Sequence, residues 1–432
     1  MADLIVELYG HRIGRLLGPT PTFDFAIEPA AFDHFALDSS VLSVAIPLVP
    51  IQNRSRKGRR QTFFAELLPE GDMLTALAQA SNVDRFDTVG LLGRYGRDVA
   101  GAIQIWDPQA PGEPKTPGIV PVNDSGVAEL LNNVLSNPLG NWPLTGKSSL
   151  AGVQDKIVLA RVDDTWNRVV DGYPSTHILK PAPKRALSAI FDEEYGSRFA
   201  RAAGLADFET TIRWFDGTPA LVIERYDRDS AAPQGRIHQE DFNQALGARG
   251  NQKYQRVGGQ VQLARIAEVF THVGDDESAR RLLTLVTISV AVGNLDLHAK
   301  NVSILHRPDG GMALAPAYDV VPQLHYPNID GEVALAIAGE LRHAALTKRH
   351  IVEEGASWGL RGADAIVDHA LEVAREVADR EAPLDGSYAR LQEDIARVTT
   401  NLIEGREAGA GGRVEIGAAG VRPVRGQDLG SV

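Results

Sequence analysis

Gly293-Asn294-Leu295-Asp296-Leu297-His298-Ala299-Lys300-Asn301 is the stretch of sequence that decides the fold. Within it, Asn301 follows Asp296 by five positions, which is the spacing of a phosphoryl-transfer catalytic loop. In such a loop the aspartate orients or deprotonates the acceptor hydroxyl, and the asparagine binds a metal ion on the phosphates. Asp319, in Pro316-Ala317-Tyr318-Asp319-Val320, comes eighteen residues after Asn301 and supplies the second metal ligand. The stretch therefore predicts a phosphoryl-transfer site.

Two further side chains of this loop have predicted roles. His298 is expected to brace the loop, and Lys300 is expected to stabilise the transferring phosphate through its charge. The competing interpretation is that Asp296 and Asn301 are ordinary polar residues of a loop and that Asp319 begins a turn. Each motif alone fits that interpretation equally well, but their order and separation together favour the catalytic one.

A lysine on a strand, paired with a glutamate on a helix, binds the α and β phosphates of ATP in kinases. Lys180 ends the apolar run His177-Ile178-Leu179 and is the leading candidate for this lysine. Glu194 opens the helix that is predicted to follow and is its expected partner. A lysine at a strand end is more often simply solvated, so the prediction depends on the motifs downstream.

The phosphate-binding loop and the hinge are less clearly marked. No G-x-G-x-x-G motif precedes Lys180. Its place is taken by the small, flexible segment Gly146 to Lys156, whose backbone N–H groups can cradle phosphates, although an ordinary surface turn is the alternative. Glu224-Arg225-Tyr226 ends the last predicted strand of this region, where a kinase hinge would recognise adenine through backbone groups. A charged strand exit is the alternative there.

The composition indicates a globular protein of more than one subdomain. At 432 residues the chain exceeds what a single core usually serves, and its hydrophobic fraction of 44% is enough for two or three. The longest apolar run, Leu282 to Val292, is too short to span a membrane and is predicted to be a buried helix. Without an N-terminal signal pattern, the chain is expected in the cytoplasm, with no membrane partner.

Charge and cysteine content limit the chemistry. With no cysteine, only oxygen and imidazole ligands remain for a metal, and this set suits Mg²⁺ best. A net charge of −12 argues against broad affinity for nucleic acid, so any DNA contact is expected to be local or supplied by a partner. The basic cluster Arg54 to Arg60 can meet phosphate or an acidic partner, but a solvated loop is the simpler interpretation.

The hydrophobic pattern is rich in strands first and in helices later. The predicted strands are Leu4 to Leu17 in two pieces around Tyr9-Gly10-His11, Val41 to Val49, Ala102 to Trp106, Lys156 to Val162, His177 to Lys180 and Ala220 to Glu224. The predicted helices are Leu74 to Ala80, Glu193 to Ala203, Gln239 to Leu246, Gln260 to Val273, Ala279 to Val292, Ala363 to Ala378 and Gly386 to Ile403. This order is typical of a two-lobed kinase that holds nucleotide in its cleft.

The predicted fold is of the α+β class: a two-lobed protein-kinase-like fold with an extra N-terminal α/β subdomain and a mainly helical C-terminal lobe. The expected divisions are the N-terminal subdomain (1–106), a proline-rich linker (107–121), the nucleotide-binding remainder of the N-lobe (122–226), the helical C-lobe with the catalytic loop and metal site (227–405) and a disordered, glycine-rich tail (406–432).

Taken together, these residues resemble the HipA family of serine/threonine kinase toxins from bacterial toxin–antitoxin systems. The resemblance covers the chain from the first strand to about residue 400. The motifs that carry it are Phe63 to Pro69, Gly96 to Ala102, Ser149 to Lys156, His177 to Lys180, Glu224 to Arg228, His238 to Phe242, Asp296 to Asn301 and Ala317 to Asp319.

The resemblance implies roles for individual residues, with ATP and Mg²⁺ as cofactors. It implies that Asp296 is the catalytic base and that Asn301 and Asp319 bind the metal. It also implies that Ser149, or else Ser148, is an autophosphorylation site. A group of about −2 charge would be repelled from a loop that holds phosphates, which would silence the kinase. The residues implied around the nucleotide are Ala151, Gly152, Val153, Gln154, Asp155, Lys156, Lys180, Glu224, Arg225, Tyr226, His298, Lys300, Asn301, Tyr318 and Asp319.

The resemblance also implies partners. Members of the family phosphorylate aminoacyl-tRNA synthetases and stall growth, and a small helix-turn-helix antitoxin of the HipB kind carries them to operator DNA. Two other functions stay open: a small-molecule phosphotransferase of the aminoglycoside or choline kinase kind, and a non-catalytic corepressor that docks an antitoxin. Asn294 stands where the small-molecule enzymes carry a histidine, and the intact catalytic residues argue against the corepressor.

Overall fold

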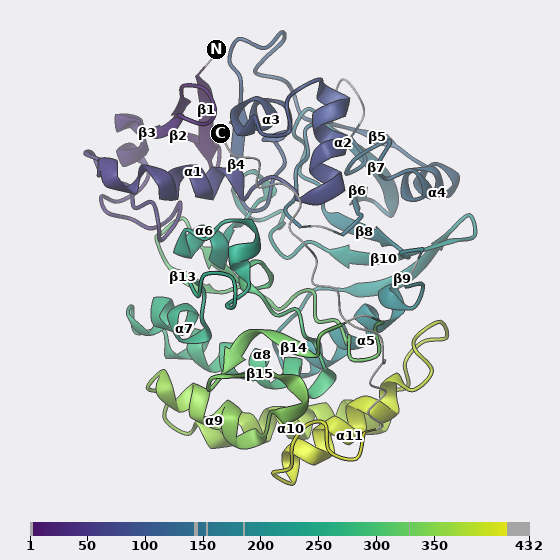
Figure 1. Cartoon of the computed structure of the whole chain (residues 1–432). Helices are drawn as coiled ribbons and strands as arrows, with labels where there is room; N and C mark the ends of the chain where they lie inside the picture. Colours follow the sequence, from purple (N-terminus) through teal and green to yellow (C-terminus); the bar gives the residue numbers. More distant parts are fainter. Residues whose placement is uncertain (1–2, 142–145, 153, 185, 328, 413–432) are drawn as a thin grey trace, which may run out of the picture.

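The computed structural model describes residues 3–141, 146–152, 154–184, 186–327 and 329–412. Figure 1 shows the chain passing from an N-terminal subdomain, through a sheet beside it, to a helical lobe at the opposite end of the molecule. A cavity is lined by residues of both the sheet and the helical lobe. This is the α+β, two-lobed arrangement that the sequence predicts. None of the described helices is long and apolar enough to cross a membrane.

The N-terminal subdomain is built on a four-stranded antiparallel sheet of order β3-β2-β1-β4. Tyr9 and Gly10 connect β1 to β2 with positive φ angles of 53° and 81°, as a tight hairpin turn requires. Helix α1 packs on β3, and α3 packs on β4. The elements are β1 (Leu4–Leu8), β2 (His11–Leu17), β3 (Asp24–Ile27), η1 (Pro29–Asp33), η2 (Arg54–Arg56), α1 (Lys57–Ala65), α2 (Gly71–Ser81), α3 (Thr88–Tyr95) and β4 (Ile103–Trp106).

Two predictions for this subdomain are wrong. The segment from Val41 to Val49 forms turns and one isolated bridge, between Ser39 and Leu48, because Pro47 has no N–H to donate to a ladder. The basic cluster is not a loop, although Arg54, Arg56 and Arg59 are exposed as expected. It runs into α1, and the guanidinium of its last residue, Arg60, is buried against the carboxylate of Asp24 at 2.7 Å.

The second sheet has six strands in the order β5-β7-β6-β8-β10-β9, and every neighbouring pair is antiparallel. The prediction of a linker over residues 107–121 is wrong at its end, because residues 118–121 pair with β7 as the edge strand β5. Lys180 lies in β8, opposite Leu221 of β10. The elements are β5 (Gly118–Pro121), α4 (Asp124–Asn132), β6 (Ile157–Val162), β7 (Thr165–Val170), β8 (His177–Pro181), α5 (Ala189–Ala202), β9 (Thr210–Phe215) and β10 (Thr218–Glu224).

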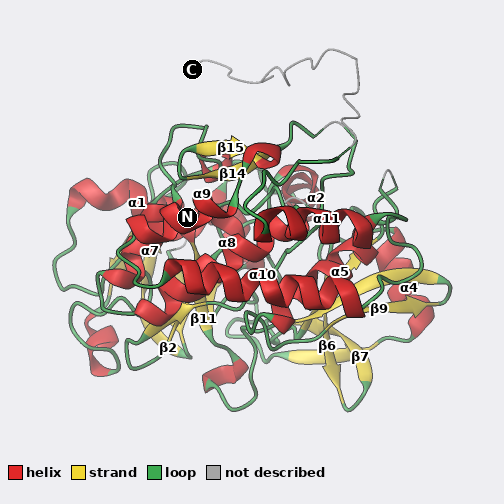
Figure 2. Ribbon diagram, turned by 90° about the horizontal axis from the view of Figure 1, so that it is seen from below, coloured by secondary structure: helices red, strands yellow, loops and turns green. Residues whose placement is uncertain are grey.

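The helical lobe carries the three-stranded sheet β11-β12-β13 and the hairpin β14-β15 beside its helices. In Figure 2, α10 crosses the middle of the view, and it packs against α8, α9 and α11. The elements are η3 (Pro233–Gly235), β11 (His238–Asp241), α6 (Phe242–Leu246), η4 (Gly250–Lys253), α7 (Leu263–Thr271), α8 (Asp276–Val292), η5 (Ala299–Asn301), β12 (Ser303–His306), β13 (Met312–Leu314), β14 (Glu332–Ile337), β15 (Glu340–Arg342), η6 (His343–Ala345), α9 (Lys348–Ser357), α10 (Ala363–Arg380) and α11 (Leu391–Ile403).

Two helices of this lobe differ from their predictions. Instead of one helix over Gln239 to Leu246, residues 238–241 pair with β12 and a short α6 follows. Asp241 marks the change, because its carboxylate caps α6 by accepting a hydrogen bond from the Gln244 N–H at 2.9 Å. The last helix begins at Leu391 and not at Gly386.

Helix α8 leads into residues 293–301, the predicted catalytic loop, and places this loop at the cavity. The Asp275 carboxylate caps its first turn by accepting from the Ser278 N–H at 3.0 Å, and Leu282 to Val292 lies in a largely buried helix, as predicted. The helix stops at Gly293, whose φ of 74° is left-handed and where an added Cβ would lie 2.5 Å from Leu324. Glycine is therefore required where the chain turns into the catalytic loop.

Buried apolar side chains form two main cores. One runs through the N-terminal subdomain and the six-stranded sheet, and the other fills the helical lobe. Helix α5 joins the two, because Phe191 packs with Leu221 of the sheet whereas Phe199 belongs to the helical core. The tail predicted from residue 406 is wrong for residues 406–412, since Ala408 is fully buried and donates its N–H to Leu346 O. Residues 413–432 lie outside the described residues.

Candidate active site

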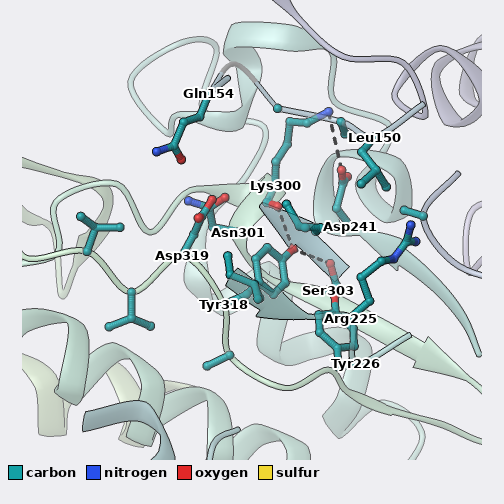
Figure 3. Close-up of a pocket in the computed structure, with 18 of the residues that line it drawn as sticks. Leu150, Gln154, Arg225, Tyr226, Asp241, Lys300, Asn301, Ser303, Tyr318 and Asp319 are labelled. Atoms are coloured by element: carbon teal, nitrogen blue, oxygen red, sulfur yellow. Dashed lines mark hydrogen bonds and ion pairs between the residues drawn. The ribbon is translucent and has the colours of Figure 1, made fainter. Parts of the chain in front are cut away.

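Most of the predicted site residues meet in one cavity of about 500 Å³, seen in part in Figure 3. Asp155 does not line this cavity, and Val153 lies outside the described residues. The predicted residues that do line it are Ala151, Gly152, Gln154, Lys156, Lys180, Glu224, Arg225, Tyr226, Asp296, His298, Lys300, Asn301, Tyr318 and Asp319.

Backbone hydrogen bonds fix the catalytic loop that follows α8. The His298 N–H donates to Asp296 O at 2.7 Å, and the Asn301 N–H donates to His298 O at 2.9 Å. The side chain of Asn294 accepts a hydrogen bond from the Asp296 N–H at 3.1 Å. These bonds hold the loop in a shape that leaves the Asp296 side chain 41% exposed at the cavity.

The surroundings of Asp296 suit a proton acceptor. Burial raises the pKa of this carboxyl to about 6, although the Tyr254 hydroxyl, which donates to it at 3.0 Å, acts in the opposite direction. Burial also lowers the pKa of His298 to about 3, so its imidazole is neutral. Its Nε2 lies 3.8 Å from the Asp296 carboxylate, which is too long for a hydrogen bond, and its ring packs edge-on against Tyr254. His298 therefore packs against Tyr254 beside Asp296, whose carboxyl is mostly ionised at neutral pH.

Asn301 and Asp319 present oxygen atoms to the same part of the cavity (Figure 3). Asn301 Nδ2 donates to Asp296 O at 2.9 Å, which leaves its Oδ1 to face a cation. Asp319 has a left-handed φ of 54°, which is uncommon for a residue other than glycine. Proteins bind Mg²⁺ through one or two carboxylates together with phosphate oxygens, so these two residues fit that ion. Within the described ranges, no group of three or more His, Asp or Glu side chains is arranged to hold a metal.

Lys180 is held between two carboxylates. Its ammonium lies 2.7 Å from Glu193 on α5 and also contacts Asp319. Burial alone would lower the pKa of Lys180, but the two carboxylates raise it, so the lysine stays charged. The prediction that Glu194 is the partner is wrong, because Glu194 faces another way and pairs with Arg198, four residues on, at 2.8 Å.

The segment expected to cradle phosphates lies along the cavity wall. Gly152 has a φ of 112°, a backbone conformation that favours glycine. Lys156 Nζ donates to Ala151 O at 2.7 Å and closes the loop on itself. Burial lowers the pKa of Lys156 to about 8, and the nearby charge of Lys180 acts in the same direction. The loop therefore brings a second cation close to Lys180.

Ser149, the predicted autophosphorylation site, is fully buried. Its hydroxyl donates to Leu67 O at 3.0 Å, and its N–H donates to Asp98 O at 3.0 Å. The hydroxyl of Ser148 is likewise engaged, with the Asp98 carboxylate at 3.0 Å. Phosphorylation of either serine therefore requires the loop to leave the place that it occupies here.

Two tyrosines form an aromatic wall of the cavity. The rings of Tyr226 and Tyr318 stack with centroids 5.7 Å apart. The Tyr318 hydroxyl donates to Lys300 O at 2.8 Å and shares a hydrogen bond with the Ser303 hydroxyl at 2.6 Å (Figure 3). Tyr318 thereby ties the wall to the backbone of the catalytic loop.

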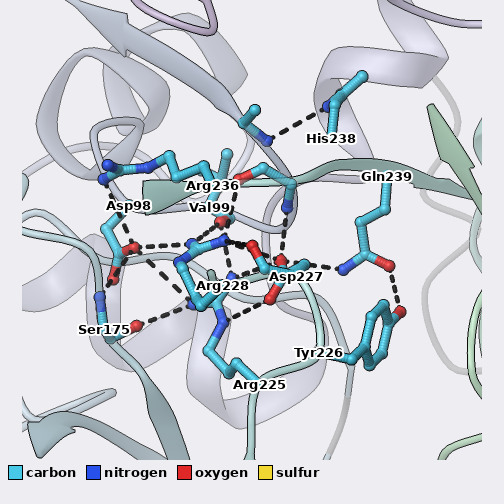
Figure 4. Close-up of polar contacts among 12 residues, drawn as sticks. Asp98, Val99, Ser175, Arg225, Tyr226, Asp227, Arg228, Arg236, His238 and Gln239 are labelled. Atoms are coloured by element: carbon cyan, nitrogen blue, oxygen red, sulfur yellow. Dashed lines mark hydrogen bonds and ion pairs between the residues drawn. The ribbon is translucent and has the colours of Figure 1, made fainter. Parts of the chain in front are cut away.

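The side chain of Arg225 turns into a buried cluster of three arginines and two aspartates, drawn in Figure 4. Its guanidinium donates to Asp227 at 2.8 and 2.9 Å. The second aspartate, Asp98, lies 3.0 Å from Arg228 and 3.9 Å from Arg236. Asp98 also bonds to Ser148 and Ser149 in the segment predicted to cradle phosphates, which is the proposed nucleotide loop and is called the nucleotide loop below. The cluster therefore connects this loop with Glu224 to Tyr226, the predicted hinge.

Lys300 is not placed as predicted. In Figure 3 its side chain runs toward Asp241 and away from Asn301. Its ammonium lies 2.5 Å from Glu66, 3.5 Å from Glu70 and 3.6 Å from Asp241. This arrangement contradicts the expectation that Lys300 stabilises the transferring phosphate, because three carboxylates already balance its charge.

The cavity residues that sequence reasoning missed include Lys253, Tyr254 and Glu193. Lys253 is buried and pairs with Glu70 at 3.2 Å. Lys253 ends the short helix η4 and Tyr254 follows it, in a segment whose residue types give no signal. Glu193 lies in the predicted helix beside Glu194, and the sequence does not show which of these two neighbouring side chains faces Lys180.

Lys180, on a strand, faces the predicted catalytic loop of the helical lobe across a cavity large enough for a nucleotide. This arrangement places the protein in the protein-kinase-like class. Comparison with known protein families narrows this class. The model of the HipA N-terminal domain matches residues 4–106, and that of the HipA-like C-terminal domain matches residues 148–381. The chain therefore belongs to the HipA family.

Individual relatives agree with this assignment. Y4mE of Sinorhizobium fredii, which bears a kinase name, is 35% identical over 64% of this chain and 67% of its own. The serine/threonine-protein kinase toxin HipA of Shewanella oneidensis is 27% identical over 91% of this chain and 93% of its own. A solved complex of HipA, HipB and operator DNA from Shewanella oneidensis contains a chain that superposes with a TM-score of 0.74 at 24% identity, covering 93% of this chain and 96% of that one. This last likeness establishes the fold.

Proposed function

We propose that this protein is the kinase toxin of a type II toxin–antitoxin pair and transfers the γ-phosphate of ATP to a serine or threonine of a protein. The observation that carries the proposal is the meeting of Lys180, Asp296, Asn301 and Asp319 in one cavity, although the first and last are 139 residues apart in the chain. Membership of the HipA family and the kinase names of the relatives support it.

In the proposed reaction, the ATP phosphates lie between the 151–156 segment and Lys180, and Lys156 supplies a second positive charge. Asn301 and Asp319 would hold Mg²⁺, which would neutralise charge on the phosphate oxygens. Asp296 orients the acceptor hydroxyl and takes its proton. The hydroxyl oxygen forms a bond to the γ-phosphorus, the bond to the β–γ bridging oxygen breaks, and ADP leaves.

Adenine is proposed to lie beside Glu224 to Tyr226. The N–H groups of Glu224 and Arg225 already donate to Glu209 O and Thr176 O, each at 2.9 Å. These two N–H groups are therefore not free to recognise adenine. Contact of adenine with the aromatic wall of Tyr226 and Tyr318 suits the site better. This wall offers a flat apolar surface for a base.

Autophosphorylation at Ser149, or at Ser148, is proposed to switch the kinase off. A phosphate of about −2 charge cannot return to the buried position against Leu67 O, and the carboxylate of Asp98 nearby would repel it. The modified loop would therefore stay out of the cavity.

The proposed partners follow the family. A helix-turn-helix antitoxin of the HipB kind is proposed to bind this chain and bring it to operator DNA, which the solved Shewanella complex of HipA, HipB and operator DNA supports. The proposed acceptor is an aminoacyl-tRNA synthetase, and the proposed location is the cytoplasm. The net charge of −12 supports a DNA contact made mainly through the antitoxin.

Incubation with Mg²⁺ and γ-labelled ATP tests the proposal. Label is expected on Ser149 or Ser148 of the wild type and is expected to be absent from Asp296→Asn. Asp229→Asn, which alters an exposed turn carboxylate, serves as the matched control and should be labelled normally. Label that persists in Asp296→Asn would falsify the assignment of the base.

Expression without an antitoxin separates the competing functions. Growth arrest that Asp296→Asn relieves is expected for the kinase toxin. Drug resistance instead of arrest would indicate a small-molecule phosphotransferase, and operator repression without any label would indicate a non-catalytic corepressor.

A further inference from the structure

The motif Phe63 to Pro69 has no role in the function proposed so far, yet its end lies against the active site. Residues 66–70 connect α1 to α2 in the N-terminal subdomain. Glu66 and Leu67 line the nucleotide cavity, although they come from outside the two lobes that form its walls.

The carboxylates of the segment hold the catalytic loop. Glu66 lies 2.5 Å from the Lys300 ammonium, and Glu70 lies 3.5 Å from it. Lys300 is the residue immediately before Asn301, the proposed metal ligand. The two carboxylates therefore fix the loop one residue from the site at which the cation would bind.

Glu70 also reaches the segment on the other side of Asp296. Its carboxylate lies 3.2 Å from the ammonium of Lys253. The next residue, Tyr254, donates its hydroxyl to Asp296 at 3.0 Å. Glu70 therefore contacts both Lys300 and Lys253, and Lys253 directly precedes Tyr254, whose hydroxyl holds the proposed base.

The backbone of the segment holds the nucleotide loop. Leu67 O accepts the hydroxyl hydrogen bond of Ser149 at 3.0 Å. The Glu70 N–H donates to Gly152 O at 3.1 Å. These two bonds bracket residues 149–152, so one short segment contacts both of the loops that must be aligned for phosphoryl transfer.

Further contacts make the segment rigid. The Glu66 carboxylate also accepts from the Gly250 N–H at 3.1 Å and from Asn243 Nδ2 at 3.3 Å. Buried charges of this kind are costly to desolvate and are a weak source of stability compared with apolar packing. Their concentration on Lys300 and Lys253 fits a positioning role better than a stabilising one.

We propose that residues 66–70 are a brace of the active site: Glu66 and Glu70 are positioning residues that fix the catalytic loop through Lys300, and the backbone at Leu67 and Glu70 keeps the nucleotide loop in register with it. This inference rests on the kinase function proposed above. It makes the N-terminal subdomain part of the catalytic machinery. When the nucleotide loop leaves, the backbone bonds at Leu67 and Glu70 are lost, but the contacts of the two carboxylates with Lys300 remain.

A double-mutant cycle tests the route through Lys300. Glu66→Gln keeps the shape of the side chain and removes its charge, so the first-order rate constant for autophosphorylation at saturating ATP, written kcat here, is expected to fall about tenfold. The dissociation constant for ATP should stay within about twofold, because the backbone bonds to the nucleotide loop remain. In a Lys300→Met background, Glu66→Gln should cost less than about a further twofold, since the residue through which it acts is gone. Full, independent losses in the double variant would overturn the proposal, as would an unchanged kcat in the single variant.

Glu28→Gln is the matched control for the cycle. Glu28 lies in the same subdomain and pairs with Arg12 at 2.6 Å and Arg15 at 2.8 Å, away from the cavity. Its replacement should leave kcat unchanged. Glu70→Gln provides a second test variant, because the Glu70 side chain is 23% exposed and its replacement disturbs packing least.

Hydrogen exchange tests the brace without any need for catalysis. In Glu66→Gln/Glu70→Gln, the amides of residues 296–301 should exchange about tenfold faster than in the wild type, while those of β1 to β4 should be unchanged. Equal exchange in the catalytic loop would overturn the proposal. If the wild type transfers no phosphate, the proposed function fails, but this measurement still decides whether residues 66–70 hold the loop.

Discussion

Tyr254 donates its hydroxyl to the carboxylate of Asp296 at 3.0 Å. The bond favours the ionised form of a carboxyl whose pKa burial raises to about 6. It therefore works against burial and keeps the proposed base in the form that can take a proton at neutral pH.

The activity is expected to fall as the pH drops through about 6, because Asp296 is then protonated and accepts no further proton. Tyr254→Phe removes the donor that favours the carboxylate, so the acidic limb of kcat/KM should move to higher pH. The rate of label transfer between pH 5 and pH 8 measures this. Tyr95→Phe, which removes a buried hydroxyl bonded to Leu77 O in the N-terminal subdomain, should leave the limb in place. A limb that stays in place in Tyr254→Phe would contradict the account.

Neighbouring glutamates of α5 should differ sharply in their effect on nucleotide binding. Glu193→Gln removes a carboxylate that holds Lys180, so the dissociation constant for ATP should rise about tenfold. Glu194→Gln only breaks the pair with Arg198 and should change it less than about twofold. Fluorescence titration with a labelled nucleotide measures both. Equal effects of the two changes would show that Lys180 is not placed by Glu193.

The proposed metal ligands predict a specific dependence on Mg²⁺. Asn301→Ala removes one of two oxygen ligands, so the Mg²⁺ concentration that gives half-maximal activity should rise at least about tenfold. Asn132→Ala, which removes an exposed hydrogen bond to Thr218, is the control and should not shift it. A titration at saturating ATP measures both. An unchanged Mg²⁺ requirement in Asn301→Ala would remove this residue from the metal site.

The buried cluster around Asp98 should matter for stability. Asp98→Asn leaves three buried arginines with Asp227 as their one remaining carboxylate in the cluster, so the free energy of unfolding should fall by about 3–5 kcal/mol. Asp164→Asn, at a side chain that is 91% exposed, should change it by less than about 0.5 kcal/mol. Urea denaturation measures both. A small effect of Asp98→Asn would show that the cluster is not a structural connection between hinge and nucleotide loop.

The same cluster sets a pH dependence of stability. Burial alone would raise the pKa of Asp98, but Arg225, Arg228 and Arg236 lower it overall. A carboxyl with a lowered pKa stabilises the fold above its unfolded pKa of about 4 and loses that contribution as the pH falls further. The wild type should therefore lose stability more steeply than Asp98→Asn below about pH 4. Parallel curves for the two proteins would contradict this.

The predicted site residues that the structure brings together include those set by local spacing. Asp296 and Asn301 lie in one loop, and the structure brings Asp319 to the same cavity. The end of α8 at Gly293 is equally local, since a left-handed residue is needed there. Strands β1, β8 and β10 and helices α8 and α10 follow from their apolar patterns.

The parts that sequence reasoning misses depend on contacts between distant segments. Glu66 and Lys300 are 234 positions apart, and no periodicity links them. Residues 238–241 look helical, but pairing with β12 makes them a strand. The partner of Lys180 is missed for a related reason: the packing of α5 against the sheet, which the sequence does not show, turns Glu193 and not Glu194 toward it.

A crystal structure with a non-hydrolysable ATP analogue and Mg²⁺ tests the central claim most directly. The account predicts one cation bound by Asn301 Oδ1 and the Asp319 carboxylate, with Lys180 on the phosphates and the γ-phosphate facing Asp296. A nucleotide bound elsewhere, or a cation that touches neither Asn301 nor Asp319, would contradict it.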